Sequence, residues 1–149
     1  MISLICKQYN ITNYTINPDG SIDVNGNVFL YKKGLTEFPL TFNKVTGNFD
    51  CGENNLTSLK GSPRWVGCHF TCSNNPLTSL EFSPDYVGGY FNCEYNNLTH
   101  NYCCTDISSS FYTSLEQDGL VLNEYGKSTN YNEWRKLYKR KQILNQIFF

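Results

Sequence analysis

Three residues of this chain have the types that hydrolytic chemistry requires. Asp50, His69 and Ser73 supply a carboxylate, an imidazole and a hydroxyl, which can act together as orienting group, base and nucleophile. His69 and Ser73, however, are four residues apart on one predicted strand, roughly 13 Å along an extended chain. A nucleophile and its base must approach to about 3 Å. We therefore expect a protein without enzymatic activity.

Cysteine is the residue best suited to metal binding, and the chain contains seven. Cys68 and Cys72 form one close pair in sequence, and Cys103 and Cys104 form another. A zinc site needs four converging ligands, whereas Cys72 also fits a ladder of small buried side chains, described next. We expect no metal and no cofactor. An odd number of cysteines without a secretion signal also argues against a disulfide framework.

The elements that must position these residues follow a repeat of 21 residues. The clearest copies share a Phe, a Cys, an Asn and a Leu in phase: Phe49, Cys51, Asn54 and Leu56; Phe70, Cys72, Asn75 and Leu77; Phe91, Cys93, Asn96 and Leu98. Phe and Cys alternate with exposed residues, which predicts a short strand. The Asn amide that follows is suited to bond backbone groups of neighbouring turns. A weaker copy begins at Val28, and its Lys33 in place of Asn predicts an altered inner turn.

Stacked copies of such a unit bury a continuous core that no single copy can bury. The sequence therefore predicts a β-rich repeat solenoid with a parallel sheet along one face and loops or 3₁₀ turns on the other. We expect a single domain over residues 1–149, in which residues 1–27 form an N-terminal cap, 28–100 the repeats and 101–149 a C-terminal cap. A chain with 19 Asn and no Ala also argues against a helical bundle.

Each end of the solenoid needs a cap. Tyr14–Ile16 and Ile22–Val24 flank the turn sequence Asn-Pro-Asp-Gly, which predicts a hairpin at the N-terminus. After residue 98 the pattern fades, with Asn101 and Ser108 at apolar positions, and residues 111–115 and 120–122 are candidate degenerate strands. Apolar residues near one face predict an amphipathic helix over about residues 132–147.

The repeats resemble a known family. Segments 47–59 and 87–93 look like the short leucine-rich repeats of small proteins from tailed bacteriophages and some bacteria, and the lead-in 14–24 resembles the start of such proteins. Each unit matches the pattern L-x-L-x-x-N-x-L with Phe and Cys in two Leu places. The resemblance covers about residues 14–100. It implies a leucine-rich-repeat-like fold and a binding habit, with no catalytic residues and no defined partner.

The exposed side chains of the predicted strands form a candidate binding face. They are aromatic, amide and acidic, lie on strands about 4.8 Å apart, and need little ordering on binding. The candidate residues are Phe29, Tyr31, Asn48, Asp50, His69, Thr71, Tyr90, Asn92 and Glu94. The alternative interpretation is that these residues only support one another across the strands.

The net charge of −1 is unevenly distributed. Residues 1–126 carry six basic and twelve acidic residues, whereas residues 127–149 carry six basic and one acidic residue. The basic side chains of the predicted terminal helix are a second, less favoured binding set: Arg135, Lys136, Lys139 and Arg140. A helix packed over the last repeat is the plainest interpretation. Homo-oligomerisation and nucleic-acid binding are alternatives, although the acidic remainder of the chain argues against nucleic acid.

These features predict a non-enzymatic protein-binding module. Given the resemblance, we expect a phage protein that acts in the host cytoplasm, where it binds and inhibits a bacterial host protein such as a defence component. The alternatives are a structural or virion-associated protein that self-assembles through the C-terminal helix, and a nucleic-acid-binding protein. We expect no membrane association, because no apolar run approaches the roughly 20 residues needed to span a bilayer.

Overall fold

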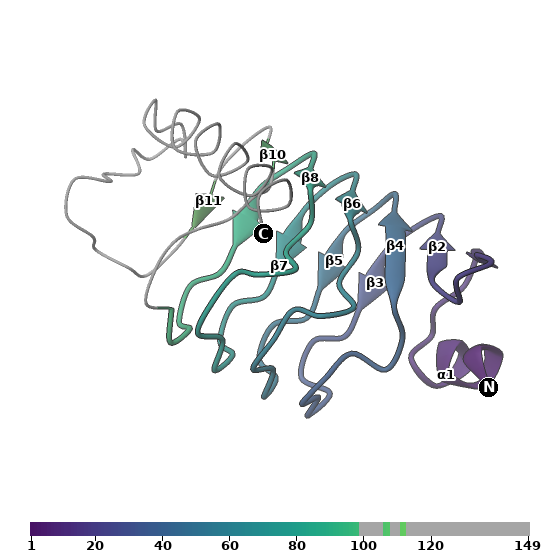
Figure 1. Cartoon of the computed structure of the whole chain (residues 1–149), viewed down its shortest axis with the longest axis horizontal. Helices are drawn as coiled ribbons and strands as arrows, with labels where there is room; N and C mark the ends of the chain where they lie inside the picture. The colour runs from purple at the N-terminus through teal and green to yellow at the C-terminus, as the bar shows by residue number, and fades with distance from the viewer. Residues whose placement is uncertain (99–105, 108–110, 113–149) are drawn as a thin grey trace, which may run out of the picture.

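The computed structural model of the chain describes residues 1–98 and the backbone of residues 106–107 and 111–112. The chain winds into a β-solenoid in which each turn contributes one strand to each of two sheets (Figure 1). The predicted solenoid with parallel strands is confirmed. The expectation of a single sheet opposite loops or 3₁₀ turns is wrong, because a second sheet lies on that side.

Sheet A begins with the antiparallel hairpin predicted for the N-terminal cap, in which Tyr14 pairs with Val24. All its other strands pair in parallel. Its strands, in order, are β1 (Tyr14–Ile16), β2 (Ile22–Val24), β4 (Phe42–Val45), β6 (Trp65–Val66), β8 (Tyr86–Val87) and β10 (Asp106–Ile107). Most repeats supply only two residues to this sheet, which is too short for a period-two pattern to stand out in the sequence.

Sheet B is parallel throughout and follows the 21-residue step. Its strands are β3 (Val28–Phe29), β5 (Phe49–Asp50), β7 (Phe70–Thr71), β9 (Phe91–Asn92) and β11 (Phe111–Tyr112). Phe49 pairs with Phe70, and Asp50 pairs with Thr71. The backbone ladder continues past the strand ends, since the Cys51 N–H donates to the Thr71 carbonyl at 2.9 Å. Residues one repeat apart therefore lie side by side.

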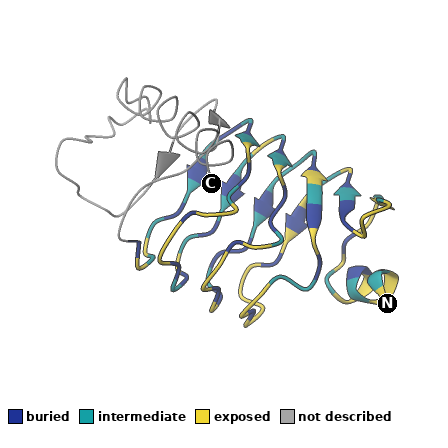
Figure 2. Cartoon of the chain, in the orientation of Figure 1, coloured by how far each residue is buried: buried dark blue, intermediate teal, exposed yellow. Residues whose placement is uncertain are grey.

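The core lies between the two sheets, where the strands are buried on their inner faces (Figure 2). The rings of Phe49 and Phe70 stack with centroids 5.6 Å apart, and Phe70 lies 4.9 Å from Phe91. Val, Cys and Leu side chains of every repeat complete the core, including Val45, Val66, Val87, Cys51, Cys72, Cys93, Leu56, Leu77 and Leu98. Each turn of the solenoid therefore covers the apolar side chains of the next.

An asparagine closes the inner turn of the second, third and fourth copies, and it is buried in the second and third. The Asn54 amide donates to the carbonyls of Leu30, Cys51 and Gly52, and its Oδ1 accepts from the N–H groups of Lys33 and Leu35. At the next two copies, the Asn75 and Asn96 amides also donate to three backbone carbonyls each, and each Oδ1 accepts from one N–H, that of Leu56 and Leu77 respectively. These side chains supply partners to carbonyls that would otherwise be buried unpaired.

The first copy, which has Lys33 at the asparagine position, keeps the same backbone turn. The residue before this position is left-handed in every copy, with φ of 54° at Lys32, 50° at Glu53, 54° at Asn74 and 55° at Tyr95. The expectation of an altered inner turn is therefore wrong for the main chain. The turn holds because the Asn54 side chain of the following copy bonds the Lys33 N–H at 2.9 Å.

The N-terminus contains a helix that the sequence analysis did not predict, α1 (Ile2–Gln8). Ile2, Ile5 and Tyr9 are partly buried against the core, and Cys6 is fully buried. These four residues recur at helical spacing, which is the signal that the sequence offered. No helix in the described part of the chain has the length and apolarity needed to cross a membrane.

Parallel pairing continues past residue 100 through a shortened last turn. Ile107 pairs with Val87 and Phe111 pairs with Phe91, so the step here is 20 residues instead of 21. The pattern is thus displaced by one residue, and only β11 (Phe111–Tyr112) represents the strand expected over residues 111–115. The strand expected over 120–122 and the helix over about 132–147 lie outside the described residues.

Candidate functional site

The outward face of sheet B brings the candidate residues together in three columns, each one repeat apart. The columns are Asn27, Asn48, His69 and Tyr90; Phe29, Asp50, Thr71 and Asn92; and Tyr31, Gly52, Ser73 and Glu94. Phe29 and Tyr31, in the first turn, keep 55% and 42% of their surface exposed. Asp50, Thr71 and Asn92 are half-buried by their neighbours. The result is a continuous face with an aromatic end.

The first column is locked by side-chain bonds to the backbone of the next turn. Asn27 Oδ1 accepts from the Asn48 N–H at 2.8 Å, and Asn48 Oδ1 accepts from the His69 N–H at 3.1 Å. His69 Nδ1 then accepts from the Tyr90 N–H at 3.0 Å, and the two rings stack 3.9 Å apart. A Cβ at Gly89 would lie 2.1 Å from Nδ1, so only glycine admits this ring. His69 is thus engaged structurally at Nδ1.

The central column contains a carboxylate in a place where an amide serves equally well. Asp50 Oδ1 accepts from the Gly52 N–H at 2.9 Å, and Asn92 Oδ1 accepts from the Glu94 N–H at 3.0 Å. Burial raises the pKa of Asp50, the Gly52 bond acts against this shift, and the charge of Glu53 adds to it. Among residues 1–98, no lysine or arginine forms an ion pair with Asp50.

Beside the third column, a cation lies between an aromatic ring and a carboxylate. Lys32 Nζ lies 2.8 Å from Glu53 Oε2 and 5.2 Å from the centroid of the Tyr31 ring. The Tyr31 hydroxyl donates to the other Glu53 oxygen. The bonds from Lys32 and Tyr31 lower the pKa of Glu53. This cluster joins the first and second turns of the solenoid at the edge of the face.

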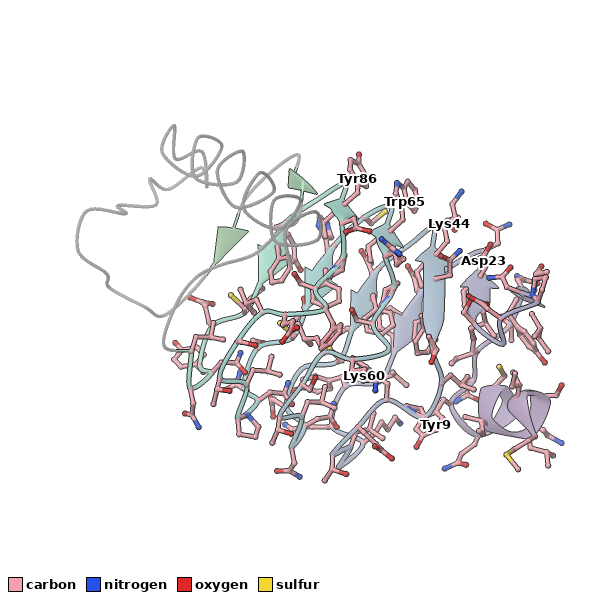
Figure 3. All side chains as sticks on the ribbon, viewed as in Figure 1. Tyr9, Asp23, Lys44, Lys60, Trp65 and Tyr86 are labelled. Atoms are coloured by element: carbon pink, nitrogen blue, oxygen red, sulfur yellow. The ribbon has the colours of Figure 1, made fainter. Side chains whose placement is uncertain are left out.

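Sheet A carries an outward column that the sequence analysis missed, in which Lys44, Trp65 and Tyr86 lie in a row (Figure 3). Lys44 Nζ lies 4.8 Å from the Trp65 ring centroid, and the Trp65 and Tyr86 rings stack at 5.5 Å with an interplanar angle of 11°. Their 21-residue spacing was the available signal, but this side of the repeat was expected to be loop. Lys44 and Tyr86 therefore both pack against Trp65.

An open groove of about 690 Å³ runs along the loops that lead into sheet A. Polar side chains line it, including Asn43, Ser83, Arg64 and Asp85. Arg64 and Asp85 bond each other at 2.9 Å, so the arginine that lines the groove is already paired.

The structure also places the residues considered for metal binding. In the portion of the chain with described side chains, no three His, Cys, Asp or Glu residues gather as metal ligands. Cys51, Cys72 and Cys93 are buried, and burial raises the pKa of Cys51 well above its ordinary value. Neutral buried thiols act here as small apolar side chains. The basic residues at positions 135, 136, 139 and 140 lie outside the described residues.

Comparison of the chain with protein-family models, with curated proteins and with solved structures found no match. The class of protein that the described residues define is therefore a β-solenoid with two sheets and a patterned outward face.

Proposed function

We propose that this chain is a non-enzymatic protein-binding module that uses the outward face of sheet B. The observation that carries the proposal is the order already present in this face. Its first column is fixed by bonds from Asn27, Asn48 and His69 to the backbone of the following turn. These side chains are already ordered in the free chain, so binding a partner costs less conformational entropy.

The composition of the face supports a protein partner. Phe29 and Tyr31 expose aromatic surface at one end, and aromatic side chains are enriched in protein interfaces. Asp50 has no cation beside it among the described residues. Sheet A is the weaker candidate, because its outward aromatic residues Trp65 and Tyr86 are only half-exposed, whereas Phe29 and Tyr31 on sheet B are exposed.

The narrower proposal concerns identity and source. We propose that the chain is a leucine-rich-repeat-like protein of phage origin that acts in the host cytoplasm and inhibits a bacterial protein, such as a defence component. Its support is the resemblance of segments 47–59 and 87–93 to short repeats of that kind. Expression in bacteria that carry a defence system should raise the plating efficiency of a phage sensitive to it, and unchanged plating across such systems would remove this narrower proposal.

The binding proposal is tested by capture of proteins from a bacterial lysate with the full chain. Thr71→Arg places a long cation in the middle of the face, whereas Thr78→Arg makes the same change on an exposed loop residue of the same repeat. We expect one protein to be captured by the wild type and by Thr78→Arg and to be lost with Thr71→Arg. Equal capture by all three chains, or capture of no protein, would contradict the proposal.

A further inference from the structure

The chain holds one cation between an aromatic residue of its first turn and a carboxylate of its second. Lys32 lies 2.8 Å from Glu53 and 5.2 Å from the Tyr31 ring centroid. A cation that lies near both a ring face and a carboxylate is stabilised by the ring quadrupole and by the opposite charge. Lys32, Tyr31 and Glu53 all belong to this chain, so this cluster already contains its cation.

The neighbouring column repeats the aromatic and the carboxylate without the cation. Phe29 of β3 pairs in register with Asp50 of β5. Phe29 is 55% exposed, and no lysine or arginine of residues 1–98 forms an ion pair with Asp50. None of the twelve outward positions of the three columns is a lysine or an arginine. The face therefore offers an acidic, aromatic position with no cation of its own.

The fold does not require the charge at Asp50. Asn92 occupies the same position two turns later and makes the same bond, at 3.0 Å to the Glu94 N–H compared with 2.9 Å from Asp50 to the Gly52 N–H. A half-buried carboxylate without a cation is costly, and burial raises its pKa. Positions where a sequence departs from the locally favourable residue are often functional.

We propose that Phe29 and Asp50 form a site for a cationic side chain, arginine or lysine, of the protein that docks on sheet B. This inference rests on the proposed function and specifies its partner as one that presents a basic residue to the centre of the face. Charge complementarity selects this occupant, because the face has carboxylates at Asp50 and Glu94 and no lysine or arginine in its columns.

The test is a titration of the ¹⁵N-labelled full chain with arginine amide, followed by NMR at the Gly52 N–H. This amide donates to Asp50 and therefore reports directly on a cation bound there. Citrulline amide, which has nearly the same shape and the same α-ammonium group but lacks the guanidinium charge, is the matched ligand control. We expect a saturable shift of the Gly52 resonance with arginine amide and no shift with citrulline amide. Equal shifts with both ligands, or no shift with either, would overturn the site.

Asp50→Asn is the decisive variant, since Asn92 shows that asparagine preserves the local bond. We expect it to weaken arginine amide binding at least tenfold, while Glu81→Gln, at an exposed turn residue outside the face, changes it less than twofold. Equal weakening by both variants would overturn the assignment to Asp50. The basic residues at 135, 136, 139 and 140 can be neutralised in the free chain. A resulting shift of the Gly52 resonance would mean that one of these residues occupies the site, and it would overturn the proposal that a partner supplies the cation.

The outcomes separate this inference from the proposed function. Capture of a protein that depends on Thr71, together with no response of Gly52 to arginine amide, would discard the cation site and leave the binding face. A response of Gly52 without any captured protein would leave a cation site and discard the protein-binding function.

Discussion

At the residue scale, two adjacent asparagines have opposite roles. Asn54 is buried and makes five hydrogen bonds to backbone groups, whereas Asn55 is exposed. Asn54→Ala should lower the free energy of unfolding by about 3–5 kcal/mol, because it leaves several backbone groups buried without partners. Asn55→Ala should change it by less than about 0.5 kcal/mol. Urea denaturation measures both, and similar losses for the two variants would contradict the assigned role of Asn54.

Asp50 gives a second prediction at this scale, through pH. Burial raises its pKa in the folded chain above the ordinary value of 3.8, so the folded state holds the proton more tightly than the unfolded state. The contribution of Asp50 to stability therefore falls as pH rises from that value through the raised pKa, and then stays constant. Asp50→Asn removes this contribution. Relative to the variant, the wild type should be less stable at pH 7 than at pH 3 in urea denaturation, and a gap that is the same at both pH values would contradict the burial of a carboxylate here.

At the scale of the elements, the sequence predicted sheet B and missed sheet A. Three strands of sheet B, β5, β7 and β9, lie in a repeated phase of Phe and Cys that is long enough to show alternation, as at Phe70 and Cys72. In sheet A a single buried residue, such as Val66, follows one outward residue, Trp65, and two residues cannot define a period. The last turn was misread for a different reason, because the loss of one residue displaced Ile107 from the expected position.

Close packing of successive turns gives a prediction for sheet A. A Cβ at Gly67 would lie 2.2 Å from the carbonyl oxygen of Thr46 in the preceding turn. Gly67→Ala should therefore force the two turns apart and lower the free energy of unfolding by about 1–3 kcal/mol more than a glycine substitution without a clash. Gly20→Ala is the control, because its Cβ meets no atom within 4 Å and only its φ of +84° is strained. Equal losses for the two variants in thermal or urea denaturation would count against this packing.

At the scale of the whole molecule, the repeat predicted the solenoid and the columns of outward residues, and the turn sequence Asn-Pro-Asp-Gly predicted the N-terminal hairpin. The sequence did not reveal which side chains of those columns are engaged. The bond of His69 to Tyr90 and the pairing of Lys32 with Glu53 depend on contacts between turns that are 21 residues apart. Such contacts follow from the register of the sheets and from small backbone distances, which a linear pattern does not specify.

The solenoid has two sheets, and we propose that only sheet B binds the partner. Tyr90 and Tyr86 provide a matched pair, since both are half-buried tyrosines of one turn and lie on sheet B and sheet A respectively. The most direct test is photo-crosslinking in a bacterial lysate with p-benzoylphenylalanine at one position or the other. We expect a specific protein adduct from position 90 and none from position 86. An adduct from position 86 alone, or the same adduct from both positions, would contradict a binding face confined to sheet B.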